Sequence, residues 1–193
     1  MINYIFRRLK DRYAASIIAG WTESSDPEKF VHEDIGIAAY LLELWRQQRQ
    51  QEDWPPDKRQ SFVDLGCGNG LLVFILSSEG HPGLGLDLRR RNIWDSFPAS
   101  VELREQAVEA GLETAWPGKD WLLGNHSDEL TPWLPIMAAR FEREDVARPS
   151  IYYKTLLGLG PATGPSLAVL TASLASTSGG TGGRACSETT WTG

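Results

Sequence analysis

The residues with the clearest chemical potential lie between Ser61 and Val73, where a short apolar run is interrupted by three glycines and then resumes. The order Asp64-Leu-Gly-Cys-Gly-Asn-Gly70 gives the spacing D-x-G-x-G-x-G, with the glycines at Gly66, Gly68 and Gly70. Glycine accepts positive φ angles and lets a ligand approach the main chain closely, which a Cβ would obstruct. We therefore interpret this segment as a strand, a ligand-binding loop and the start of a helix, in preference to a plain turn.

The glycine spacing separates two nucleoside-containing ligands. The dinucleotide fingerprint G-x-G-x-x-G would require its third glycine at position 71, which is Leu71. A nicotinamide cofactor, and with it an NAD(P)-binding oxidoreductase, is therefore the second choice. The segment resembles the first motif of class I methyltransferases, which use S-adenosylmethionine, and this resemblance places Asp64 in the acidic position that opens the motif.

Two further polar residues stand at the ends of expected strands. Asp87 stands at the penultimate position of the short apolar run 83–88 and lies 87 − 70 = 17 residues beyond the last loop glycine. In nucleoside-binding α/β folds an acidic residue about 20 residues past the loop binds the ribose hydroxyls, although Asp87 could instead cap the helix expected over 89–97. Class I methyltransferases commonly place an acidic residue against the adenine amino group after the third strand, here 101–108. Gln106 occupies that place, and its carbonyl can accept the same hydrogen bond.

A second polar cluster follows the fourth expected strand, 119–124, and contains Asn125, His126, Ser127 and Asp128. Ligands of open α/β sheets bind beyond the carboxyl ends of the strands. Methyl transfer to a ribose 2′-hydroxyl needs a positioned hydroxyl and an acceptor for its proton. Asp128 or His126 could be that acceptor, and Asn125 could position the hydroxyl or line the donor pocket. Alternatively, Ser127 or Asp128 caps the helix expected to contain residues 130–137.

Charged clusters elsewhere have two explanations each. Arg89, Arg90 and Arg91 directly follow the second strand and could neutralise RNA phosphates, or they could form a solvated face. His32 to Asp34 are adjacent on an expected helix, so they point in different directions and are expected to form a solvated face rather than a metal site. No metal site is expected anywhere in the chain.

The elements that position these residues can be predicted from caps and periodicity. Residues 1–22 are compatible with a helix whose basic side faces outward. A better-marked helix begins after Asp26 as N-cap and Pro27 at the first helical position. The polar run 46–53 and then Pro55-Pro56 are expected to stop it. A further helix follows the glycine loop from Leu71 and ends near Gly80. Alternating short strands and helices predict an α/β fold.

Composition limits the classes of protein that remain. A chain of 193 residues has room for one ordinary domain, and its formal net charge of −6 argues against capture of nucleic acid by net charge alone. The two cysteines, Cys67 and Cys186, support neither a disulfide framework nor a zinc site. No apolar run of about 18 residues or signal peptide is found. We therefore expect a cytoplasmic protein without membrane contact, of unknown oligomeric state.

Several strings together resemble the tRNA (uracil-O(2)-)-methyltransferases, roughly over residues 20–140. These strings are Asp26 to Leu42, Phe62 to Leu72, Ser77 to Gly83, Asp87 with its arginines, and Asp120 to Trp133. The resemblance implies a class I, Rossmann-like, three-layer α/β fold and an enzyme that binds S-adenosylmethionine. Its implied reaction is methylation of the 2′-hydroxyl of a uridine, at position 44, in serine tRNA.

The resemblance ends before the C-terminal part, which is poor in charge and rich in Gly, Ser, Thr and Ala. Only 151–157 and 166–170 could be further strands, so the sheet is expected to be incomplete in its C-terminal half. We expect an N-terminal segment over 1–25, a methyltransferase-like domain over 26–157 and a low-complexity, disordered tail over 158–193. A truncated, spliced or frame-shifted product that binds cofactor without turnover is the alternative to an active enzyme.

Overall fold

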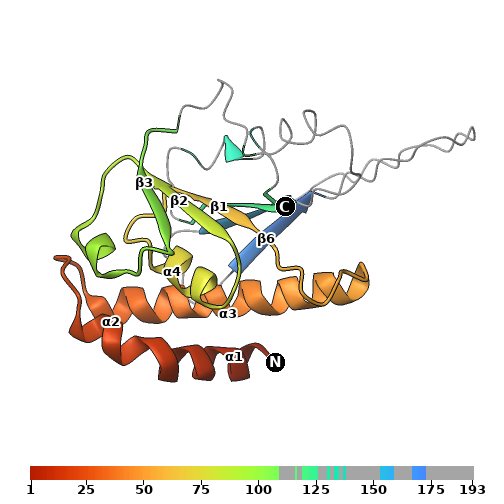
Figure 1. Ribbon diagram of the computed structural model, residues 1–193, viewed down its shortest axis with the longest axis horizontal. Helices are drawn as coiled ribbons and strands as arrows, with labels where there is room; N and C mark the ends of the chain where they lie inside the picture. Colours follow the sequence, from red (N-terminus) through yellow and green to blue (C-terminus); the bar gives the residue numbers. More distant parts are fainter. Residues whose placement is uncertain are drawn as a thin grey trace, which may run out of the picture.

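The core of the computed structural model is a four-stranded, all-parallel sheet with the strand order β3-β2-β1-β4 (Figure 1). The strands are β1 (Phe62–Leu65), β2 (Gly83–Asp87), β3 (Glu102–Glu105) and β4 (Trp121–Leu123). The structure describes residues 1–108, 116, 119–125, 130, 133, 134, 137, 153–158 and 167–172, the last two ranges by their backbone alone. Strand order 3-2-1-4 is that of the first part of a Rossmann-like sheet, as predicted.

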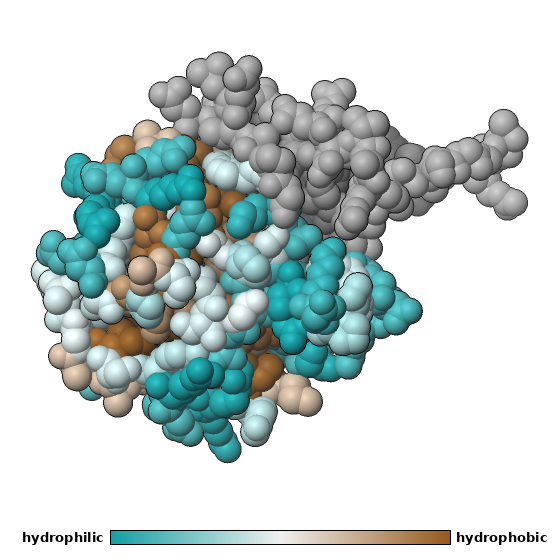
Figure 2. Space-filling view, in the orientation of Figure 1, coloured by the Kyte–Doolittle hydropathy of each residue, from teal (hydrophilic) through white to brown (hydrophobic). Residues whose placement is uncertain are grey.

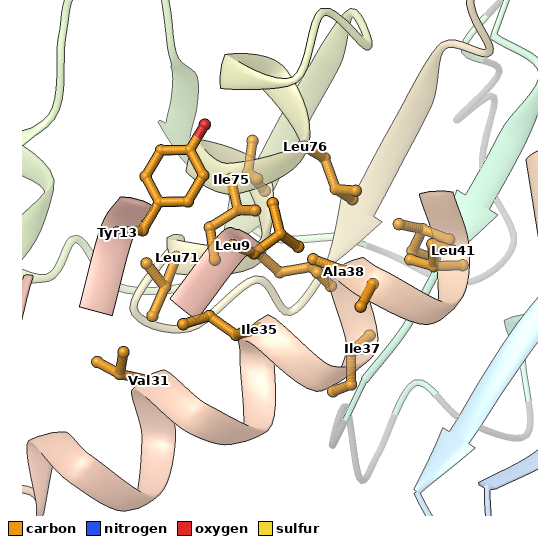
Figure 3. Close-up of a cluster of buried hydrophobic side chains, with 14 of the residues drawn as sticks. Leu9, Tyr13, Val31, Ile35, Ile37, Ala38, Leu41, Leu71, Ile75 and Leu76 are labelled. Carbon is orange, nitrogen blue, oxygen red and sulfur yellow. The ribbon is translucent and has the colours of Figure 1, made fainter. Parts of the chain in front are cut away.

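One face of the sheet is covered by helices from the N-terminal half of the chain. These are α1 (Ile2–Leu9), a π-helical turn (Lys10–Ala14), α2 (Ala15–Ala19), α3 (Pro27–Gln51) and α4 (Leu71–Ser78). In Figure 3, Leu71 and Ile75 of α4 lie close to Leu9 of α1 and to Ile35 of α3. Leu9, Ile35, Leu71 and Ile75 are fully buried. The N-terminal helices therefore belong to the same core as the glycine loop and its helix.

A polar cluster fastens the N-terminal helices to the end of α4. The carboxylate of Glu79, the C-cap of α4, accepts hydrogen bonds from Arg8, Arg12 and the Tyr13 hydroxyl, the last at 2.9 Å. Burial, with the adjacent Glu79 carboxylate, raises the pKa of Tyr13 to about 12. Some of the basic residues expected to face outward thus pair with the body of the domain.

The opposite face of the sheet carries a second apolar cluster. Val63 and Leu65 of β1 point to this side and pack with Leu122, Leu134 and Met137. The amide of Leu134 donates to the Leu130 carbonyl at 3.1 Å, and that of Met137 donates to Trp133 at 2.8 Å. This i to i−4 pattern is helical, so the described residues Leu134 and Met137 agree with the helix expected there.

The predicted start of α3 is confirmed in atomic detail. The Asp26 side chain accepts from the amides of Glu28 and Lys29, and Pro27 stands at the first helical position. The helix ends at Gln51, inside the polar run 46–53 that was expected to stop it together with the two prolines that follow. Side-chain pairs one turn apart, such as Arg46 with Glu43 at 2.8 Å, stabilise this part of the helix.

One further element differs from the sequence-based prediction, and two expected strands are present. The helix expected over 89–97 is a short 3-10 helix, η2 (Asn92–Ser96), so the three arginines precede it, with Arg89 in a bend and Arg91 in an extended conformation. The strands expected at 151–157 and 166–170 are present as β5 (Tyr153–Gly158) and β6 (Leu167–Ala172). They pair antiparallel with each other and form a separate two-stranded sheet. Apart from β6 and Gly158, the expected tail over 158–193 lies outside the described residues.

Polar side chains gather at several places on the surface seen in Figure 2, among them the lower edge near α1, the C-terminal end of α3 and the upper left. Within the part of the chain that the structure describes, no helix is both long enough and apolar enough to cross a membrane.

Candidate donor-binding site

The loop between β1 and α4 has the backbone conformation that its glycines permit. Gly66, Gly68 and Gly70 all have positive φ, at 73°, 53° and 73°. The amides of Gly66 and Cys67 both donate to the Leu86 carbonyl of β2, at 2.8 and 3.0 Å. The loop thus turns at the carboxyl edge of the sheet in a conformation that L side chains rarely adopt.

Asp87 points toward this loop. Its Oδ2 accepts a hydrogen bond of 2.8 Å from the Gly68 amide, and its Oδ1 accepts one of 3.0 Å from the amide of Arg89. Oδ1 also lies 3.8 Å from an Nη atom of Arg91. Each carboxylate oxygen can accept more than one hydrogen bond, so Asp87 retains acceptor capacity at the place predicted for the ribose hydroxyls.

Gly68, in the middle of the loop, and Gly70, at its end, have different surroundings. A Cβ on Gly70 would lie 2.8 Å from Leu103 Cδ1 and 3.1 Å from Trp94 Nε1, whereas a Cβ on Gly68 would meet no atom within 4 Å. The Trp94 indole donates a hydrogen bond of 3.0 Å to the Gly68 carbonyl, and this bond stabilises the backbone of the loop. The main chain at Gly68 is therefore open on the side where a ligand would approach.

Two buried carboxyl groups lie under the loop. Asp64 is only 2 % exposed, and its Oδ1 has no hydrogen-bond partner among the described residues. Burial, with the nearby charge of Asp87, raises the pKa of Asp64 to about 7. Asp34 of α3 is 8 % exposed, and its Oδ2 accepts a hydrogen bond of 3.4 Å from the side-chain amide of Asn69. Burial also raises the pKa of Asp34 to about 7, and the charge of Asp64 acts in the same direction.

Asp34 is a site residue that the sequence analysis missed. The expectation of a solvated face at His32 to Asp34 is wrong for Asp34, because its side chain points into the interface between α3 and the loop. A signal was present in the spacing: Asp34 lies three residues after Val31 and four before Ala38, both fully buried. Residues three and four apart share one face of a helix.

The sheet register brings two more predicted residues to this edge. Asp87 pairs with Glu105 and Asp64 pairs with Leu123 across the parallel strands. Gln106, the residue after Glu105, is exposed, and its backbone amide donates to the backbone carbonyl of Asp87 at 2.8 Å. Asn125 follows Leu123, the last residue of β4, by two residues and is half-buried. His126 and Asp128, the predicted proton acceptors, lie outside the described residues.

The three arginines next to Asp87 are not equivalent. Arg90 pairs with the exposed carboxylate of Asp95, and Arg91 lies near Asp87. Arg89 is exposed, and no ion pair is found for its guanidinium among the described residues. An RNA contact by these residues stays a prediction, and Arg89 is the arginine whose charge is most available for it.

The charge of the site discriminates between the two candidate ligands. Asp34, Asp64 and Asp87 surround the loop, and among the described residues Arg91 is the one cation paired with any of them. The pyrophosphate of a nicotinamide cofactor carries negative charge and would be repelled here. A sulfonium nucleoside with an ammonium group carries positive charge. Its fit is supported by the unpaired Asp64 Oδ1 and the open main chain at Gly68.

An open α/β sheet with a glycine loop and a carboxylate at the end of β2 defines a nucleoside-binding, Rossmann-like domain. Residues 1–110 match the family model described as "Predicted AdoMet-dependent methyltransferase". The chain belongs to this family, and its cofactor is S-adenosyl-L-methionine. The match begins at Met1, so α1 and α2 are part of the family domain.

Curated relatives give a narrower likeness. The chain is 54 % identical over 136 residues to the probable tRNA (uracil-O(2)-)-methyltransferase of Mus musculus, with 70 % of this chain and 19 % of that protein covered. It is 56 % identical over 135 residues to the Homo sapiens protein of the same description, covering 70 % and 17 %. The chain thus spans about a fifth of the length of these relatives.

The domain is also similar to solved methyltransferase structures, at low identity. One is the plantazolicin methyltransferase BpumL in complex with SAH, with a TM-score of 0.42 and 15 % identity, covering 81 % of this chain and 62 % of that one. The strand order and the family match define the fold of this chain.

Proposed function

We propose that this chain contains the donor-binding part of a cytoplasmic enzyme that methylates the 2′-hydroxyl of a uridine in tRNA, specifically uridine 44 of serine tRNA. The proposal is supported by the similarity to tRNA (uracil-O(2)-)-methyltransferases over 70 % of the chain. The observation that carries it is the convergence of Asp87 on the Gly68 amide beside an open main chain.

Each residue at the edge of the sheet would have a distinct role. Bound across the loop, S-adenosylmethionine would supply an electrophilic methyl group. Asp87 would hold the ribose hydroxyls and Gln106 would accept from the adenine amino group. Asn125 would orient the attacking 2′-hydroxyl, and Asp128 or His126 would accept its proton.

Methyl incorporation into unmodified serine tRNA tests this proposal. The reaction is run with radiolabelled donor, and the product is mapped for methylation at uridine 44. Asp87→Ala should abolish incorporation, and Asp57→Ala, which removes an exposed carboxylate outside the glycine loop, is the matched control. Incorporation at another nucleotide, or into every tRNA equally, would contradict the assigned substrate.

A second candidate function follows from the length of the chain. Because it spans about a fifth of its relatives, it could bind the donor without methylating RNA. Calorimetry with S-adenosylhomocysteine and with NAD separates the possibilities. Binding of S-adenosylhomocysteine without any methyl incorporation favours the binding fragment, and tighter binding of NAD would contradict both methyltransferase proposals.

A further inference from the structure

We propose that Asp34, with Asp64 behind it, forms the binding site for the α-ammonium group of the methyl donor. This inference rests on the proposed donor-binding function and assigns a specificity-determining role to a helix residue outside the glycine motif.

The strand and the helix place the two carboxyl groups on the same side of the sheet. Val63 and Leu65 face the second apolar cluster, so the alternation of β1 directs Phe62 and Asp64 to the face that α3 covers. Asp34 comes to this face from α3 and reaches the loop through Asn69. The two aspartates therefore lie on the side of the sheet that α3 covers, close enough for the charge of Asp64 to act on Asp34.

The pair lacks the counterion that buried carboxylates normally have. Asp64 Oδ1 accepts no hydrogen bond from any described residue, and Asp34 is held by one amide at 3.4 Å. The ion pairs of the described residues include neither aspartate; the nearby arginine, Arg91, lies beside Asp87. Burying charge without a partner is costly, so the site would gain free energy from an ammonium group with three N–H donors.

The direction of the donor along the sheet points to the same place. Gln106 and Asp87 lie on the β3 and β2 side of the loop, where adenine and ribose are predicted to bind. The aminoacyl end of the donor must then extend past the loop toward β1 and α3. Asn69 contacts Asp34 on that side. The side-chain carbonyl of Asn69 accepts a hydrogen bond of 2.8 Å from the backbone amide of Leu71, and this bond fixes the orientation of the Asn69 side chain.

Other titratable and charged groups around the pair have the wrong charge or another partner. Glu33 adjoins Asp34 on α3, Asp87 faces the loop from β2, and both add negative charge. The Cys67 thiol is buried, and burial raises its pKa, so it stays neutral. The ammonium group would thus be the main positive charge close to Asp34 and Asp64.

The test compares two ligands that differ at the aminoacyl end. S-adenosylhomocysteine carries the ammonium group, and 5′-methylthioadenosine lacks it. Calorimetry on the full chain should show that Asp34→Asn raises the Kd for S-adenosylhomocysteine roughly tenfold to a hundredfold, the usual effect of losing a charged hydrogen bond. The Kd for 5′-methylthioadenosine should change little. Glu28→Gln, which removes an exposed charge from the first turn of the same helix, is the control.

A measurement on the unaltered chain provides an independent readout. An ammonium group beside Asp34 favours its ionised form, so binding of S-adenosylhomocysteine near pH 7 should release protons. Its affinity should therefore fall as the pH is lowered from 8 to 6, and the affinity for 5′-methylthioadenosine should not. Equal losses for the two ligands in Asp34→Asn, or no loss for either, would overturn the inference. Failure of the unaltered chain to bind S-adenosylhomocysteine would instead contradict the proposed donor.

Discussion

The substitutions Gly68→Ala and Gly70→Ala should separate ligand approach from packing within one loop. Both residues have positive φ, so an alanine at either position costs about 1–2 kcal/mol of backbone strain. At Gly70 the new methyl group also meets Leu103 at 2.8 Å and Trp94 at 3.1 Å. Overpacking of this kind adds about 1–3 kcal/mol. Gly70→Ala should therefore reduce the free energy of unfolding by about 2–5 kcal/mol, against a usual total of about 5–15 kcal/mol.

Gly68→Ala should reduce the affinity for the donor more than it reduces the stability of the fold. Its Cβ meets no protein atom within 4 Å, so the loss of stability should stay near the strain alone. The methyl group would occupy the space through which the donor reaches the main chain, and affinity for S-adenosylhomocysteine should fall at least tenfold.

Urea unfolding and calorimetry on the two variants supply both numbers. The exposed Gly20, at the end of α2, provides a control because its φ is −96° and a Cβ there meets only backbone oxygens at 3.4 Å or more. Gly20→Ala should change neither property greatly. If Gly68→Ala binds S-adenosylhomocysteine as tightly as the unaltered chain, the donor does not approach the loop at this residue, and the site described above is wrong.

Three further predictions concern charge and packing. Asp34→Asn should be more stable than the unaltered chain at pH 8 and similar at pH 4, by urea unfolding at each pH. The folded chain keeps a proton on Asp34 up to about pH 7 that the unfolded chain releases near its ordinary pKa of 3.8, so this residue lowers stability as the pH rises through that window; an unchanged pH dependence would refute the burial argument. Leu9→Ala should reduce the free energy of unfolding by about 2–5 kcal/mol, because Leu9 is fully buried; a loss below 1 kcal/mol would mean that α1 is not part of the core. Arg89→Gln should weaken tRNA binding and reduce its salt slope by about 1, measured by fluorescence anisotropy across salt concentrations; Arg90→Gln, which removes a guanidinium already paired with Asp95, should have a smaller effect, and equal effects would contradict the distinction.

The parts of the structure that could be predicted from sequence are those with strong local signals. Asp26 with Pro27 determines where α3 begins, because a side-chain acceptor and a residue without an N–H suit those two positions. The glycines at 66, 68 and 70 similarly made the position of the loop predictable. Gly80, with a φ of 90°, made the end of α4 predictable.

The features that were missed depend on contacts between distant segments. The point within the polar run at which α3 ends could not be predicted, because Gln48 is buried and its side-chain carbonyl accepts from the Gln60 side-chain amide at 3.2 Å, 12 residues away. The burial of Asp34 depends on Asn69, 35 residues further along the chain. Neither contact has a local signature, although the position of Asp34 among buried residues of α3 was a usable indication.

The indole of Trp94 has a consequence for observing this site. It is 5 % exposed, donates to the Gly68 carbonyl and lies against Gly70, so any ligand that shifts the loop alters the polarity around this fluorophore. Emission should thus change on titration with S-adenosylhomocysteine, and the change should be lost in Trp94→Phe while the other seven of the eight tryptophans remain. The protein would then carry an intrinsic optical reporter for the occupancy of its own loop.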